Sequence, residues 1–142
     1  MSRSTLPEIR TSALETIVAH ARMEQPRECC GLLLGSIGEI VEAVPLENVS
    51  VDGIRRYEIA PADYFAQVKA CRERGDVSVV GAYHSHPRSE PVPSATDLAE
   101  GFANFWFLIA GPVSDDAPLA IRAFRLVDGV FAEDLIRAVQ PG

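Results

Sequence analysis

Apolar residues recur with helical spacing in two segments of the chain. Four of them share one face of a helix predicted from Ser12 to about Glu24: Leu14, Ile17, Val18 and Ala21. Ser12 with Glu15 three residues later has the pattern of a capping box, and Pro26 disfavours helix in the residue before it. A second helix is predicted from Pro61, which suits a first helical turn, to just before Gly75.

Shorter apolar runs predict strands between and after these helices. The run 31–35 is bounded by glycines and is typical of a strand buried on both faces, and Gly38 predicts a hairpin to a partner strand at 39–44. Further strands are expected at 57–60, 77–83 and 105–110, and as a hairpin of 119–126 with 130–131. Ser94 predicts the N-cap of a short helix to about Phe102, and 133–140 a final helical turn or two. The pattern indicates an α/β fold with a mixed sheet flanked by helices, in one domain over residues 1–142.

Composition narrows the classes of function. The 142 residues are 47% hydrophobic and 23% charged, as in an ordinary globular domain. The net charge of −7 argues against nucleic acid as a partner, because phosphate binding needs clustered Lys and Arg. No apolar run reaches the roughly 20 residues of a membrane span, and the first residues lack a signal-peptide pattern. Three cysteines, two of them adjacent, fit a reducing compartment, so we expect a cytoplasmic protein.

The strongest chemical signal lies at the end of the strand expected at 77–83. His84 and His86 stand two residues apart, so on an extended strand their side chains point the same way. Ser94 and Asp97 follow across a proline-bearing loop, and Asp97 in a first helical turn would point back toward that loop. Two imidazoles and one carboxylate suit zinc with a fourth position open for water, which is the arrangement of a hydrolase.

Each part of this pattern also has a simpler interpretation. Ser94 with Asp97 is a common helix cap without any metal, and a histidine at a strand end is often structural. Cys29 and Cys30 suggest a thiol nucleophile, but cysteines beside a buried strand are usually inert apolar residues. Three other residues are assigned no role in catalysis. Trp106 is expected in the core, His20 exposed without a partner, and Ser85 either packed or supporting the histidines from behind.

The combined pattern resembles the JAMM motif of the JAB1/MPN/Mov34 metalloproteases, minimal stand-alone prokaryotic type. The matching elements are His-x-His, seven intervening residues, Ser, two residues and Asp, with an upstream glutamate, Glu28, in the context Glu-Cys-Cys-Gly-Leu-Leu-Leu-Gly. The resemblance implies that His84, His86 and Asp97 bind Zn²⁺. It further implies that Glu28 is the general acid/base and that Ser94 steadies the reacting oxygen. It also implies a JAB1/MPN-like, three-layer architecture similar to that of cytidine deaminases.

The resemblance also implies a class of substrate. Stand-alone prokaryotic relatives act at the C-terminal Gly-Gly of ubiquitin-like sulfur-carrier proteins, so a peptidase or isopeptidase is expected. We expect the tail to bind along an exposed strand edge under the 88–93 loop, because glycines let a backbone pass close to a metal. A non-catalytic scaffold is the main alternative. A zinc deaminase is a weaker one, because its His-x-Glu and Pro-Cys-x-x-Cys signature is missing.

Overall fold

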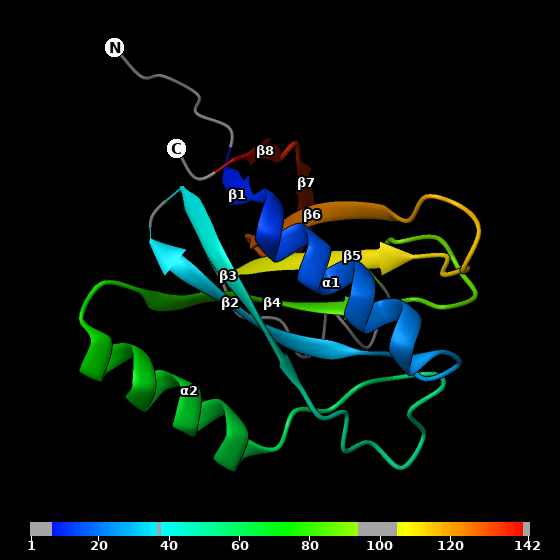
Figure 1. The fold of residues 1–142 in the computed structure, drawn as a ribbon, viewed down its shortest axis with the longest axis horizontal. Helices are drawn as coiled ribbons and strands as arrows, with labels where there is room; N and C mark the ends of the chain where they lie inside the picture. Colours follow the sequence, from blue (N-terminus) through cyan, green and yellow to red (C-terminus); the bar gives the residue numbers. More distant parts are fainter. Residues whose placement is uncertain (1–6, 37, 94–104, 141–142) are drawn as a thin grey trace.

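An eight-stranded mixed sheet forms the centre of the molecule (Figure 1). The computed structural model describes residues 7–36, 38–93 and 105–140. The strand order is β7-β6-β5-β4-β2-β3-β1-β8. The strands are β1 (Glu8–Arg10), β2 (Cys30–Ser36), β3 (Glu39–Leu46), β4 (Ser78–Ser85), β5 (Trp106–Gly111), β6 (Ala120–Val127), β7 (Val130–Asp134) and β8 (Arg137–Val139). The predicted mixed α/β sheet is confirmed, as are both hairpins, β2–β3 and β6–β7.

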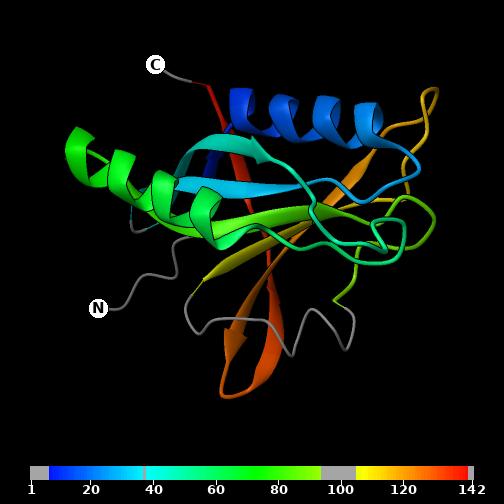
Figure 2. The same ribbon diagram turned by 90° about the horizontal axis from the view of Figure 1, so that it is seen from below.

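In the part of the chain that is described, two helices accompany the sheet, and both were predicted. The helix α1 (Thr11–Glu24) lies across one face of the sheet, as the two perpendicular views show (Figures 1 and 2). The helix α2 (Pro61–Arg74) begins at its proline, ends at a left-handed Gly75 and packs chiefly against β4. The capping box expected at Ser12 is wrong, because the helix begins one residue earlier and Arg10 occupies the N-cap without a side-chain hydrogen bond.

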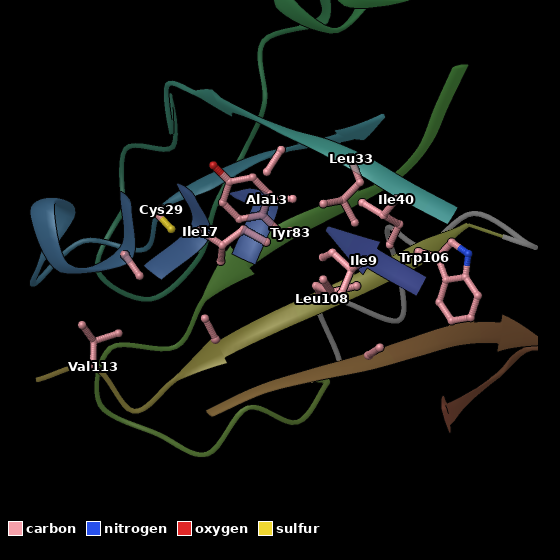
Figure 3. Close-up of a cluster of buried hydrophobic side chains, with 14 residues drawn as sticks. Ile9, Ala13, Ile17, Cys29, Leu33, Ile40, Tyr83, Trp106, Leu108 and Val113 are labelled. Atoms are coloured by element: carbon pink, nitrogen blue, oxygen red, sulfur yellow. The ribbon is translucent and has the colours of Figure 1, made fainter. Parts of the chain in front are cut away.

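The two faces of the sheet carry different clusters of apolar side chains. Residues of α1 and of the strands beneath it make up the larger one, in which Ile17, Leu33, Tyr83 and Leu108 are fully buried (Figure 3). On β2, Gly31 leaves room for the Tyr83 ring, since a Cβ there would lie 2.4 Å from Tyr83 Cε2. A smaller cluster on the opposite face contains Phe107, Ile109 and Phe124. Trp106 belongs to the larger cluster, so the expectation that it is a core residue is confirmed.

Sequence patterns fail at the N- and C-terminal parts of the sheet and in one loop. The strand expected at 57–60 is irregular, and the helical turns expected at 133–140 are replaced by the end of β7 and by β8. Neither β1 nor β8 was predicted; they pair in parallel, and Arg137 forms an ion pair with Glu8 across them. The short helix expected from Ser94 to Phe102 lies outside the described residues. In the described part of the chain, no helix has the length and apolarity needed to cross a bilayer.

Candidate functional site

The register of the sheet sets the chain segment of Glu28 beside the end of β4, where His84 and His86 follow each other. Cys30 on β2 is the cross-strand partner of His84 on β4, and the strands are antiparallel. Continuing that register by two residues sets Glu28 opposite His86, on the sheet face away from α1. All three side chains are buried, with exposed fractions of 7%, 2% and 8% in the order Glu28, His84, His86. Ser94 and Asp97, the other two predicted site residues, lie outside the described residues.

The two imidazoles converge on a single point. His84 Nε2 and His86 Nε2 are 3.1 Å apart, and the rings are tilted by 56°. Two nitrogens bound to one tetrahedral zinc at about 2.0–2.1 Å would lie roughly 3.3 Å from each other. The geometry of the pair therefore fits two ligands of one metal ion.

Each histidine is held in place by a different neighbour. His86 Nδ1 lies 2.9 Å from the carbonyl oxygen of Glu90. A carbonyl only accepts hydrogen bonds, so Nδ1 must donate its proton and the lone pair of the neutral ring is on Nε2. The ring of His84 stacks on Tyr57, with centroids 4.5 Å apart and planes inclined by 23°. Hydrogen bonding orients one candidate ligand, and aromatic stacking the other.

Ser85, between the two histidines, ties β4 to the segment that carries Glu28. Its backbone N–H donates to the Cys29 carbonyl at 3.1 Å, and its Oγ accepts from the Cys29 N–H at 2.8 Å. The side chain is fully buried. Ser85 is therefore packed, as one of its two expectations had it, and its paired bonds tie the Cys29 backbone, next to Glu28, to β4.

The cysteines next to Glu28 are structural. Burial is the main cause that raises the pKa of Cys29 to about 11 and that of Cys30 to about 12. Both thiols are therefore protonated at neutral pH, and neither is an activated nucleophile. The expectation that they are inert apolar residues is confirmed.

His20 differs from its expectation. It is half-buried on α1, and its Nδ1 lies 2.7 Å from the hydroxyl oxygen of Tyr83. Burial lowers its pKa from the usual value of 6.5, and the charge of Glu24 acts in the opposite direction. The prediction of an exposed residue without a partner is wrong because α1 packs directly over β4, a contact that helical periodicity alone does not reveal.

An apolar groove of about 720 Å³ lies on the same sheet face as the histidines. Leu32, Ala82 and Phe107 form its floor, and Tyr64 and Phe65 of α2 form one wall. Tyr57, which stacks on His84, also lines it, so the groove reaches the candidate metal ligands. An exposed strand edge was expected here, but among the described strands the edges are β7 and β8, and β4 is paired on both sides.

The donor set fits zinc as far as it is described. Within residues 7–36, 38–93 and 105–140, no three His, Cys, Asp or Glu side chains gather around one point. The described candidate ligands are the two imidazoles, whose Nε2 atoms face each other. Asp97, the predicted third ligand, falls in the part not described. Imidazole nitrogen with carboxylate oxygen is a zinc donor set with room for a further ligand.

Comparison with known proteins gives one family and several relatives. The sequence model described as prokaryotic homologues of the JAB domain matches residues 10–127. The chain is 35% identical to a desampylase of Haloferax volcanii over 73% of this chain and 79% of that protein. It is 28% identical to the CysO-cysteine peptidase of Mycobacterium tuberculosis, over 93% and 90%. It is 33% identical to a probable TtuB-protein conjugate cleaving protease of Thermus thermophilus, over 82% and 73%.

Solved structures have the same fold. A protein from Desulfitobacterium hafniense superposes with a TM-score of 0.82 at 24% identity, covering 94% of this chain and 93% of that one. A JAB1/MPN domain protein from Archaeoglobus fulgidus gives 0.62 at 23% identity, covering 96% and 100%. The JAB1/MPN-like architecture is therefore confirmed.

Proposed function

Because this chain belongs to the prokaryotic homologues of the JAB domain, we propose that it hydrolyses the bond joining the C-terminus of a ubiquitin-like sulfur-carrier protein to an attached amine. Relatives named for cleaving CysO-cysteine and TtuB–protein conjugates support this substrate class. The observation that carries the proposal is the convergence of two buried histidines 3.1 Å apart, with buried Glu28 in the segment that leads into the neighbouring strand β2. A non-catalytic scaffold would have no need to bury these three polar side chains together.

We assign His84, His86 and Asp97 as the ligands of a zinc ion, making this a JAMM-type metallopeptidase. A zinc ion held there would act as a Lewis acid and would make a water molecule nucleophilic near neutral pH. His86 has the tautomer that the role requires, since Nδ1 donates to Glu90 and Nε2 is left with its lone pair. The 88–93 loop follows the histidines in the sequence, and Asp97 lies in the segment after that loop.

Glu28 and Ser94 are assigned to the chemistry. Glu28 takes the proton of the attacking water and returns it to the leaving amine, so the same carboxylate serves as base and then as acid. Its burial and its position two residues before Cys30, the strand partner of His84, support this assignment. Ser94 Oγ donates a hydrogen bond to the oxygen on which negative charge develops.

The substrate tail would lie in the apolar groove. Its floor of Leu32, Ala82 and Phe107 suits the aliphatic residues of an extended tail, and Tyr57 marks the end next to His84. The glycines that end such a tail would pass the histidines with the least steric hindrance. We place the protein in the cytoplasm, where carrier proteins and reduced thiols occur together, and treat residues 1–142 as one domain.

A zinc measurement combined with a cleavage assay tests the proposal. The full chain is purified, its zinc content determined, and its action followed on a sulfur-carrier protein extended beyond Gly-Gly by a short peptide. We expect one zinc per chain and release of that peptide. Removing the metal with a chelator should stop cleavage, and adding zinc back should restore it.

Two controls make the result specific. A carrier that ends at Gly-Gly reports background proteolysis, and a generic unfolded protein reports unselective peptidase activity. A chain that binds zinc and cuts the unfolded protein as fast as the carrier would contradict the proposed substrate class. Wild-type cleavage by a His84→Ala, His86→Ala double variant would contradict the metal assignment.

A further inference from the structure

The loop between β3 and α2 is organised around one buried side chain, Asn48. Its Nδ2 donates to the carbonyl oxygens of Glu28 at 2.9 Å, Arg56 at 3.1 Å and, more weakly, Gly53 at 3.4 Å. Its Oδ1 accepts from the backbone N–H groups of Ser50 and Glu58, both at 3.0 Å. Carbonyls surround one end of the amide and N–H groups the other, which fixes its orientation.

These partners lie on both sides of Tyr57. Arg56 precedes Tyr57 and Glu58 follows it, so the Asn48 amide holds the backbone of Tyr57 from either side. The Tyr57 ring in turn stacks on His84 at 4.5 Å. The same amide holds the carbonyl of Glu28. One side chain therefore links the segment of the proposed general base to the aromatic ring that orients a proposed metal ligand.

Neighbouring contacts strengthen the link at Glu28. The Glu28 N–H donates to the Gly53 carbonyl at 2.7 Å, so both backbone groups of this residue are tied to the loop. The Arg27 guanidinium donates to the Asn48 carbonyl at 2.8 Å and lies against Gly53, where a Cβ would come within 2.3 Å of Arg27 Cζ. The loop thus fits closely around the start of β2.

We propose that the Asn48 carboxamide and the Tyr57 ring form a positioning unit that fixes Glu28 and His84 relative to each other. Neither group exchanges protons with the substrate. Asn48 sets the place of Tyr57, and Tyr57 restricts rotation of the His84 ring about χ2, so that Nε2 keeps facing His86 Nε2. The inference rests on the proposed zinc peptidase and adds two residues outside its predicted motif.

The test compares variants that alter this unit with variants that leave it intact. Asn48→Asp keeps the shape and one acceptor but sets an oxygen where Nδ2 faces three carbonyls, so the links to Glu28 and Arg56 are lost. Tyr57→Ala removes the stacking, and Tyr57→Phe keeps it. Ser50→Ala is the matched control in the same loop, because it removes only the hydrogen bond from the Asp52 N–H to Ser50 Oγ.

Zinc affinity, measured by competition with a chromogenic chelator, is the first readout because it needs no turnover. We expect Asn48→Asp and Tyr57→Ala to bind zinc about 10- to 100-fold more weakly, the usual effect of losing a group that orients a ligand. Tyr57→Phe and Ser50→Ala should bind zinc as the wild type does. In zinc-saturated samples, Asn48→Asp should lower kcat more than it raises KM, because Glu28 is displaced.

The results that would contradict the positioning role of Asn48 and Tyr57 are specific. A folded Asn48→Asp with wild-type zinc affinity and kcat would overturn the proposal and leave Asn48 a purely structural residue. If Asn48→Asp does not fold, the Tyr57 pair decides, and equal zinc affinity of Tyr57→Ala and Tyr57→Phe would overturn the proposal. Failure of the proposed function is distinct, because it appears in the wild type as absence of zinc or of carrier cleavage.

Discussion

Glu28 is the residue whose substitution best separates chemistry from binding. Glu28→Gln keeps the shape and burial of the side chain and removes only its ability to carry a proton. We expect normal zinc content, an unchanged fold and a kcat about 10²- to 10⁴-fold lower, the range of general acid–base catalysis. Steady-state cleavage of the extended carrier, beside metal analysis of the same sample, measures both. A wild-type kcat would remove Glu28 from the mechanism.

His20 gives the molecule a pH-dependent contribution to stability. Burial lowers its folded-state pKa, so below the usual value of 6.5 the unfolded chain binds a proton that the folded chain resists. The contribution of His20 to the free energy of unfolding therefore has its full value above pH 6.5 and declines as the pH falls below it. In His20→Gln the free energy of unfolding should drop by about 1 kcal/mol at pH 8, through the weakened bond to Tyr83. The gap to the wild type should narrow toward pH 5.

Denaturant unfolding of the metal-free proteins at several pH values measures this difference. Metal-free samples are needed because zinc binding adds its own pH dependence. Parallel pH curves for the two proteins, with a constant gap, would show that His20 does not titrate with folding.

Sequence spacing identifies site residues that lie within one short motif. It does not identify residues from distant segments that come together only when the chain folds. His84 and His86 are two positions apart on a strand, so their common face follows from the sequence. Tyr57 and Asn48 come from a loop whose course depends on hydrogen bonds to Glu28, and no periodicity describes such contacts. The available signal was an asparagine two residues after the end of β3, followed by an aromatic residue in a polar stretch.

At the scale of elements, α2 contributes more side chains to the wall of the groove than to the buried core. Its only buried residue is Cys71, and Phe65 is 66% exposed while lining the groove. An aromatic side chain left largely in water beside an apolar groove suits contact with a substrate. This exposure lets binding be tested with little effect on folding.

Phe65→Ser should weaken substrate binding and leave the fold intact. We expect the KM for a carrier substrate to rise about tenfold, on the scale of losing part of one apolar contact, with zinc content and thermal stability unchanged. Met23→Ser is the matched control, since Met23 is 75% exposed on α1, over the opposite sheet face. Equal KM values for the two variants would contradict the proposal that the substrate tail binds in this groove.

A helix or strand could be predicted where the residues of that element alone show which of its positions are buried. The run in β2 is apolar throughout and buried from Cys30 to Gly35, as its composition indicates. The strands β1 and β8 are three residues each and owe their pairing to each other and to β3. Too few residues show an alternation there, so helix and strand could not be distinguished at 133–140.

Across the whole molecule, the sheet has the main apolar core on one face and the candidate site on the other. The larger apolar cluster lies under α1, and the histidines, the groove and the smaller cluster lie on the other face. Alternation along β4 places Tyr83 in the first group and His84 in the second. Changes on the site face therefore act on binding and catalysis with limited cost to the core.

The interior position of β4 has a kinetic consequence. Its backbone amides are bonded to β2 on one side and β5 on the other, so they should exchange with deuterium only through the largest opening of the fold. The 47–60 loop has no strand partner and should open far more often. The backbone that carries the two histidines should therefore keep its place for longer than the ring of Tyr57, which stacks on one of them. Hydrogen exchange of the full chain should accordingly give two separate rates, a slow one for the amides of β4 and a faster one for those of the 47–60 loop.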